Sequence, residues 1–135
     1  VKGANGHVNT NLKAKLDACL KAAKRYDFVL LHINGADEAA HDKNPRLKRR
    51  FLERVDREVF SELKESDHVI AVAIDHVTNS ETGEHELGET PFMLFIPNHE
   101  ERGVANFCET ACKRVRIKNP MKVILLRLRK HGLCY

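Results

Sequence analysis

The chain has 135 residues, of which 42% are hydrophobic and 31% are charged. This size and composition are ordinary for one globular domain, and they allow a substantial hydrophobic core. No apolar run approaches the roughly 20 residues that a membrane-spanning helix needs. The sequence therefore predicts a soluble protein with no membrane partner.

The net charge of +4 is mildly basic, with lysines and arginines clustered in residues 113–118 and 127–130. A nucleic-acid-binding surface would normally carry interleaved aromatic residues, which are few here. We interpret both clusters as solvent-exposed helix faces and predict no nucleic-acid partner. A basic nucleic-acid binder is the weakest of the alternatives considered.

Cysteine usage indicates a reducing compartment. The four cysteines form no C-x-x-C motif, and no segment resembles a secretory signal, so a cytoplasmic location is expected. Cys108 and Cys112 are four residues apart and could contribute to a soft-metal site. Two small buried side chains on one helix face are the preferred interpretation.

The first predicted elements are a loop, a helix and a strand. Residues 1–9 are rich in glycine and asparagine and predict the loop. Asn9 or Thr10 can cap the helix, whose apolar positions follow one helical stripe: Leu12, Leu16, Cys19, Leu20 and Ala23. Residues 28–33, FVLLHI, are typical of a strand covered on both faces. Residues 34–43 predict a loop or a short helical turn.

A second helix is predicted from Asn44-Pro45, where asparagine is a good cap and proline suits the first helical position. It should end at about Glu65, because apolar residues recur at steps of four up to that point: Leu47, Phe51, Val55, Val59 and Leu63. Residues 68–74 predict a second buried strand. Residues 75–90 are polar and without period, so they predict a long loop of the kind that is usually functional.

The remaining elements are a strand over 92–96, a helix over 104–115 and a last helix that Pro120 opens and Gly132 ends. The order is helix, strand, helix, strand, strand, helix. This order predicts an α/β fold with a mainly parallel sheet covered by helices. We expect residues 1–135 to form a single domain.

Metal-ligand residue types follow the predicted strands. Asp37 and His41 follow the first strand, Asp75 and His76 follow the second, and His85 lies in the long loop. In open α/β sheets, ligands bind beyond the carboxyl ends of the strands, so all five should lie at one edge. Imidazoles combined with carboxylates suit Zn²⁺ or Mn²⁺.

Five ligands are too many for one simple tetrahedral site, and adjacent residues such as Asp75 and His76 point in different directions in an extended chain. They can serve two ions, or one ion and the groups around it. The other histidines have simpler interpretations. We expect His32 to be a hydrogen-bonded core residue and the rest to lie on the surface: His7, His68, His99 and His131.

Several segments resemble the cofactor-independent phosphoglycerate mutases of the archaeal type, within the alkaline phosphatase superfamily. DFVLLHINGADEAAH (27–41) is similar to the strand and D-E-A-G-H segment of that family. VIAVAIDHVTNSETGEH (69–85) is similar to its A-x-x-x-D-H segment with the distal histidine. The glycine-rich start and the helix before the first strand are also similar. The resemblance covers nearly the whole chain and fades after about residue 100.

The resemblance implies an alkaline phosphatase-like fold and a site for two divalent metal ions, Mn²⁺ or Zn²⁺, with Co²⁺ or Mg²⁺ also possible. It assigns Asp37, His41 and His85 to one ion, and Asp75 with His76 to the other. In the family, the second ion also binds an aspartate and the hydroxyl of a serine nucleophile. Neither has a counterpart here, so no catalytic nucleophile is assigned in this chain.

The resemblance therefore predicts the carboxy-terminal part of a glycolytic metalloenzyme that interconverts 3-phosphoglycerate and 2-phosphoglycerate through a phosphoserine. The substrate would be a small phosphorylated molecule, and this part alone would be inactive. One alternative is another phosphomutase or phosphatase of the superfamily, whose members also carry the label phosphonopyruvate decarboxylase. The other is a non-catalytic metal-binding domain. The sequence does not indicate an oligomeric state.

The sequence departs from the family pattern beside the ligands. The family's alanine-glycine before the first histidine is Ala39-Ala40, and its proline-bearing stretch after Asp-His is VTNS (77–80). An Asp-Pro that usually follows the last histidine is Gly88-Glu89. These differences leave the ligands unchanged and alter the surrounding walls, so the substrate could differ.

Overall fold

The computed structural model describes residues 1–98, 103–104, 106–113, 116–130 and 132. The chain forms two compact units. The first contains Val1–Ser66 and Thr78–Glu86, and the second contains Asp67–Val77 and Leu87–Tyr135. Three residues of interest, His99, His131 and Cys134, lie outside the described residues. Within the described part, no helix is long and apolar enough to cross a membrane.

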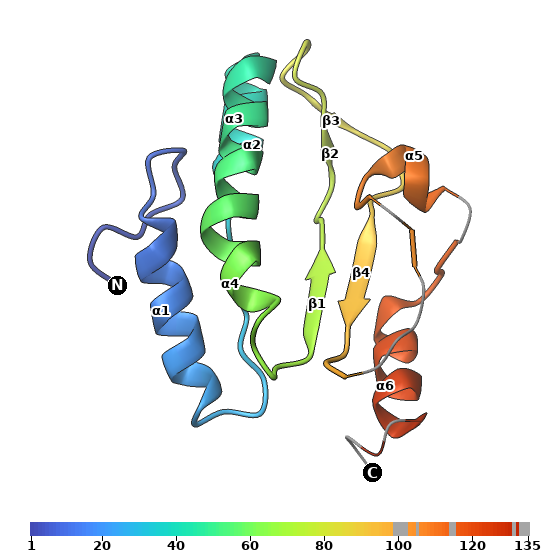
Figure 1. Cartoon of the computed structure of the whole chain (residues 1–135). Coiled ribbons are helices and arrows are strands. Elements are labelled where there is room, and N and C mark those ends of the chain that lie inside the picture. The colour runs from blue at the N-terminus through green and yellow to red at the C-terminus, as the bar shows by residue number, and fades with distance from the viewer. Residues whose placement is uncertain (99–102, 105, 114–115, 131, 133–135) are drawn as a thin grey trace. The chain divides into compact units, whose positions relative to one another are not determined.

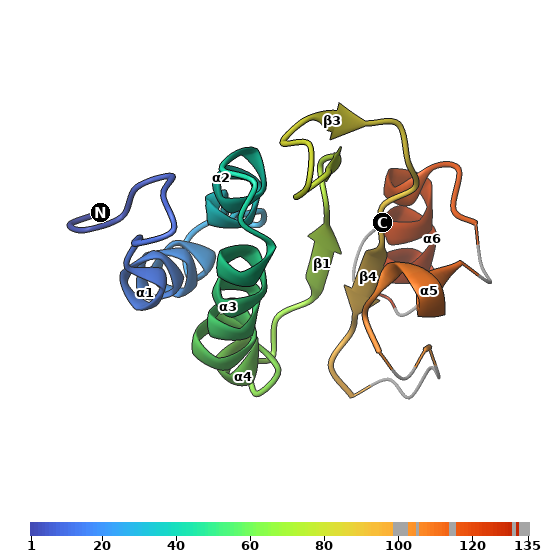
Figure 2. The same ribbon diagram turned by 90° about the horizontal axis from the view of Figure 1, so that it is seen from above.

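The first unit is mainly helical (Figure 1). Its elements are α1 (Leu12–Ala23), α2 (Gly35–His41), α3 (Pro45–Val55), the π-helical turn η1 (Asp56–Phe60) and α4 (Ser61–Leu63). Two short strands, β2 (Val77–Thr78) and β3 (His85–Glu86), pair with each other. Helix α1 lies beside the continuous α3–η1–α4 helix in both views (Figure 2).

Helix α1 begins at Leu12, one residue later than a Thr10 cap and two residues later than an Asn9 cap would place it. The Thr10 hydroxyl donates to the Asn5 carbonyl at 3.0 Å and accepts from the Asn5 amide at 3.0 Å, so it is occupied in the N-terminal loop. Asn11 caps the helix instead, and its side chain accepts from the Ala14 amide at 2.8 Å. The predicted apolar stripe is confirmed at Leu12 and Leu16, which are fully buried.

The long second helix is confirmed, including its start. The Asn44 side chain accepts from the Leu47 amide at 3.0 Å, and Pro45 is the first helical residue. Apolar residues at steps of four drift around an α-helix by about 40° per step. The π-helical turn η1 holds more residues per turn, which keeps the stripe directed at α1. Phe51, Val55 and Val59 are therefore all buried with α1.

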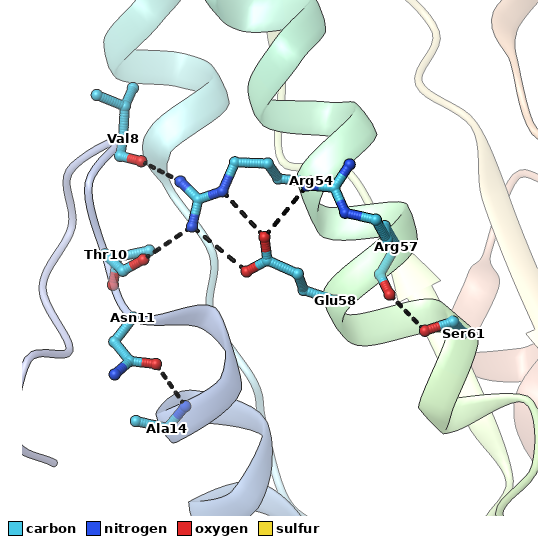
Figure 3. A network of polar contacts seen from close by, with 8 residues as sticks. All are labelled: Val8, Thr10, Asn11, Ala14, Arg54, Arg57, Glu58 and Ser61. Carbon is cyan, nitrogen blue, oxygen red and sulfur yellow. Dashed lines mark hydrogen bonds and ion pairs between the residues drawn. The ribbon is translucent and has the colours of Figure 1, made fainter.

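Arg54 connects this helix to the N-terminal loop (Figure 3). Its guanidinium donates to the carbonyl oxygens of Val8 at 2.9 Å and Thr10 at 3.4 Å. Glu58, one turn further along, accepts from Arg54 Nε at 3.2 Å. The Arg54 guanidinium beside it lowers the pKa of the Glu58 carboxyl.

The predicted strand over residues 28–33 is wrong for the described chain. The segment has no regular secondary structure, and no strand within the described ranges pairs with it. Leu31 and Ile33 pack against the core, while Phe28 and Leu30 are 81% and 77% exposed. A strand needs a neighbour to pair its backbone groups, and the described residues supply none. His32 is exposed, so the prediction of a core histidine is also wrong.

The second unit contains β1 (Ile70–Ala73), β4 (Phe92–Phe95), α5 (Glu109–Cys112) and α6 (Pro120–Lys130). Strands β1 and β4 are antiparallel, with Ile70 opposite Phe95 and Ala73 opposite Phe92. The order of elements along the sequence predicts a mainly parallel sheet, whereas this pair is antiparallel. A parallel pair needs a crossover connection that is usually helical, whereas the chain between β1 and β4 contains only the β2–β3 hairpin.

The helices of the second unit follow the prediction in part. The helix predicted over 104–115 is limited to Glu109–Cys112 in the described residues. Helix α6 begins at Pro120 as expected, and Gly132 beyond it has a left-handed backbone with φ of +68°. Cys108 and Cys112 are both half-buried with free thiols. His68 is exposed, as is His7 in the first unit, and both were predicted on the surface.

Candidate metal centre

Helix α2 presents two metal-ligand side chains on one face. Asp37 and His41 are four residues apart, a spacing that makes side chains neighbours on a helix. Gly35 lets this helix approach α3 closely, because a Cβ there would lie 2.6 Å from the Phe51 ring. Ala39 and Ala40 are fully buried. The small residues thus place the Asp37–His41 face at a defined position.

An ordered hairpin carries His85 to the same helix. The loop predicted over residues 75–90 contains β2 and β3, joined by a tight turn over 79–84. The Asn79 amide donates to the Glu84 carbonyl at 2.9 Å, and the Asn79 side chain accepts from the Glu81 amide at 2.7 Å. Gly83 has φ of +76°, in the left-handed region that favours glycine. The turn reverses the chain and returns His85 toward α2.

Three donor atoms meet where the hairpin reaches α2. His41 Nε2 lies 3.4 Å from Asp37 Oδ1, and His85 Nε2 lies 3.9 Å from the same oxygen. The two Nε2 atoms are 3.1 Å apart. The three side chains, Asp37, His41 and His85, are between about a quarter and a half exposed, so an ion could enter from solvent.

A backbone carbonyl selects the tautomer of His41. His41 Nδ1 lies 2.7 Å from the carbonyl oxygen of Gly83. A carbonyl only accepts hydrogen bonds, so Nδ1 carries a proton, and in the neutral ring Nε2 keeps its lone pair. That lone pair is on the ring atom that lies near Asp37 and His85. This is the arrangement that metal-binding histidines usually have.

The spacing of the donor atoms fits a divalent transition metal. Ligand atoms about 2.1 Å from one ion in a tetrahedral arrangement stand about 3.4 Å from one another. The three observed separations, 3.1, 3.4 and 3.9 Å, bracket that value. Two imidazoles and a carboxylate are also a donor set that Zn²⁺ and Mn²⁺ accept.

Two residues that the sequence did not indicate support this cluster, Thr78 by direct contact and Lys48 through Thr78. The Thr78 hydroxyl donates to Asp37 Oδ1 at 2.7 Å, and Thr78 is only 5% exposed. Lys48 Nζ donates to the Thr78 carbonyl at 2.9 Å and so connects α3 to β2. Only the position of Thr78 two residues after His76 could have indicated this role, and threonine alone is a weak signal.

Glu38 anchors the ligand-bearing helix on its other side. Its carboxylate accepts from the Val8 amide at 2.6 Å and makes a short contact with His7 Nδ1. The hydrogen bonds from His7 and then from Val8 lower the pKa of the Glu38 carboxyl. The glycine-rich N-terminal loop is thereby attached to α2, next in sequence to Asp37.

The other two predicted ligands belong to the second unit. His76 Nε2 lies 3.9 Å from Asp75 Oδ2, and the Asp75 side chain is 96% exposed while that of His76 is 34% exposed. The structure thus brings together Asp37, His41 and His85 within the first unit. A shared role for Asp75 and His76 stays a prediction.

Comparison with known proteins gives a family and several relatives. Residues 1–122 match the Metalloenzyme superfamily. A protein named 2,3-bisphosphoglycerate-independent phosphoglycerate mutase from Methanococcus aeolicus is 40% identical over 81% of this chain and 28% of its own length. A second protein of that name, from Methanocaldococcus jannaschii, is 33% identical over 93% of this chain and 32% of its own length.

A solved structure of a protein from Pyrococcus horikoshii is also similar. It is 41% identical, with a TM-score of 0.58, over 62% of this chain and 26% of that protein. The chain thus spans about a third or less of the proteins that it matches.

Proposed function

The chain belongs to the Metalloenzyme superfamily, and on that premise we propose that it is part of a 2,3-bisphosphoglycerate-independent phosphoglycerate mutase. The reaction would interconvert 3-phosphoglycerate and 2-phosphoglycerate, a step of glycolysis in the cytoplasm. The observation that carries the proposal is the convergence of three metal-ligand atoms within 3.9 Å of one another. The names of the similar archaeal proteins support it.

Asp37, His41 and His85 would bind one divalent ion, and Asp75 with His76 would bind the second. We favour Mn²⁺ or Zn²⁺, with Co²⁺ or Mg²⁺ as the other candidates. When bound, such ions would neutralise the charge that develops on a phosphoryl group in transfer.

The chain's own residues would bind the ions and orient the ligand side chains. The Gly83 carbonyl holds the His41 ring with Nε2 available as a ligand atom. The family resemblance assigns the nucleophile to a serine that no serine of this chain matches. We therefore assign ion binding to this chain and expect the phosphoserine to form elsewhere in the intact enzyme.

In that enzyme we propose that residues 1–135 form one part of a single alkaline phosphatase-like catalytic domain, with a mainly parallel sheet. Phe28 and Leu30 support this, because they are exposed while the alternating residues Leu31 and Ile33 pack on the core. Pairing with a further strand would satisfy the backbone there, and a layer packed on that face of the sheet would cover both side chains.

A second candidate function is non-catalytic metal binding. It is favoured by the presence of the ligand cluster in a chain without a matching nucleophile. Another phosphomutase or phosphatase reaction is the third candidate, favoured by the altered residues VTNS (77–80) beside the ligands.

The test begins with calorimetric titration of Zn²⁺ and Mn²⁺ into this chain, with Asp37→Ala and His41→Ala as variants. The proposal predicts that both variants lose the tight site, while His68→Ala, an exposed histidine outside the cluster, binds as the wild type does. A protein of the length of its relatives should then convert 3-phosphoglycerate to 2-phosphoglycerate. Ion binding without that conversion would favour the non-catalytic candidate. No ion binding by either protein would contradict both.

A further inference from the structure

Thr78 contacts the ligand cluster without belonging to the predicted set of ligands. It is the second residue of β2 and is 5% exposed, so its hydroxyl has little access to water. That hydroxyl donates to Asp37 Oδ1 at 2.7 Å. The same oxygen is the one that lies 3.4 Å from His41 Nε2 and 3.9 Å from His85 Nε2.

We propose that Thr78 is a positioning residue that fixes the metal-binding oxygen of Asp37 toward the two imidazoles. This inference rests on the proposed function. A carboxylate oxygen has two lone-pair directions, so Oδ1 can accept from Thr78 along one and face the imidazoles along the other. The hydrogen bond selects one rotamer of Asp37 before an ion binds. Less side-chain conformational entropy is then lost when the ion binds.

The position of Thr78 is itself constrained from two sides. Lys48 of α3 donates to the Thr78 carbonyl at 2.9 Å, which fixes the backbone of β2 against the helix. The next residue, Asn79, closes the hairpin through its backbone bond with Glu84. Threonine is β-branched and stiff at χ1, so a fixed backbone also fixes the direction of the hydroxyl.

The hairpin therefore contributes to the cluster three times. His85 supplies a ligand atom, Gly83 holds the His41 ring, and Thr78 holds Asp37. All three contacts come from eight residues of the sequence, from 78 to 85. A single ordered turn thus prepares the ligands of one ion.

The experiment compares Zn²⁺ affinity of the wild-type chain with that of Thr78→Val and Thr78→Ser. Valine has the shape of threonine without the hydroxyl, and serine keeps the hydroxyl. We expect Thr78→Val to weaken binding about 10-fold or more, in the range seen when groups behind metal ligands are removed. We expect Thr78→Ser to remain within about 3-fold of the wild type. Thr82→Val is the matched control, because it removes a hydroxyl of the same hairpin that contacts the Glu84 amide instead of a ligand.

A second readout needs no metal. Three-bond couplings to the Asp37 carboxyl carbon report its χ1 angle in the metal-free chain by nuclear magnetic resonance. One dominant rotamer is expected in the wild type and in Thr78→Ser, and averaging among rotamers is expected in Thr78→Val. A role in general stability would not produce this local change, or its rescue by serine.

Two results would overturn the inference. One is Zn²⁺ affinity of a folded Thr78→Val chain within about 3-fold of the wild type, and the other is an unchanged Asp37 rotamer in that variant. If Thr78→Val does not fold, loss of affinity or of the rotamer in Thr78→Ser would overturn it. If neither the wild-type chain nor a protein of the length of its relatives binds an ion, the proposed function is contradicted, while the metal-free couplings would still decide the role of Thr78.

Discussion

The two units differ in how their candidate ligands are held. In the first unit, Asp37 accepts a hydrogen bond from Thr78 and His41 contacts the Gly83 carbonyl. In the second unit, Asp75 has a side chain that is 96% exposed, and Pro91 is the only buried residue among those described. The comparison indicates that residues 1–66 and 78–86 contain most of what prepares one ion site. A role for the Asp75–His76 pair in binding a second ion stays a prediction.

The largest expected effect is the loss of Zn²⁺ affinity when one histidine of the ligand cluster is removed. His85→Ala removes one of three converging donor atoms, so we expect Zn²⁺ affinity at the first site to fall about 100-fold or more. His68→Ala, at an exposed histidine outside the cluster, should leave that site nearly unchanged. Calorimetry with both variants checks the difference. Equal losses in the two variants would contradict the assignment of His85 as a ligand.

Core substitutions should reveal the same contrast in stability. Phe51 is 2% exposed and packs with Leu12 and Leu16, so Phe51→Ala should lower the free energy of unfolding by about 3–5 kcal/mol. Phe95, in β4 of the second unit, is 37% exposed, and Phe95→Ala should cost only about 1 kcal/mol. Urea unfolding followed by circular dichroism measures both. A larger loss for Phe95→Ala would contradict this contrast between the units.

Gly83 connects stability to the ligand cluster. Its φ of +76° and the 2.9 Å between a built Cβ and the His41 carbonyl make alanine unfavourable there. Gly83→Ala should cost about 1–2 kcal/mol of stability. It should also weaken Zn²⁺ binding, because the Gly83 carbonyl holds the His41 ring. Gly6→Ala is the control, since a Cβ at Gly6 meets nothing within 4 Å. Equal affinities for the two variants would argue against a role for the turn.

The smallest expected effect is a pH dependence of stability from Glu58. Arg54 lowers the pKa of this carboxyl in the folded chain (Figure 3), so the ionised form is favoured by folding. The contribution of ionised Glu58 to the free energy of unfolding is present above the unfolded pKa of about 4.3 and is lost as the pH falls through the lower folded pKa. Glu58→Gln should therefore be less stable than the wild type near pH 7, and the difference should shrink in acid. Glu81→Gln, at an exposed residue of the hairpin, is the matched control.

Local signals allowed the prediction of the elements that short stretches of sequence determine. Asn44 and Pro45 specify a helix start by their own chemistry, and α3 begins there. The spacing of Asp37 and His41 places both on one helical face whatever surrounds it. The apolar step of four from Leu47 to Leu63 predicted the buried face of the helix, although the π-helical turn that aligns it was not foreseen.

Features that depend on distant partners could not be predicted in the same way. FVLLHI (28–33) has the composition of a strand, but a strand forms only where a neighbour pairs with it. Thr10 is a good helix cap by type, yet its hydroxyl is used by Asn5 in the preceding loop. The contact between Thr78 and Asp37 spans 41 residues, and nothing in the VTNS segment indicates its partner.

The central claim is that His41 and His85 bind the same ion with Asp37. X-ray absorption at the zinc edge, on the chain loaded with one equivalent of Zn²⁺, tests it most directly. We predict scattering from two imidazoles with Zn–N distances of about 2.0–2.1 Å, reduced to one imidazole in His85→Ala. A spectrum with no imidazole scattering, or one that His85→Ala leaves unchanged, would contradict the claim.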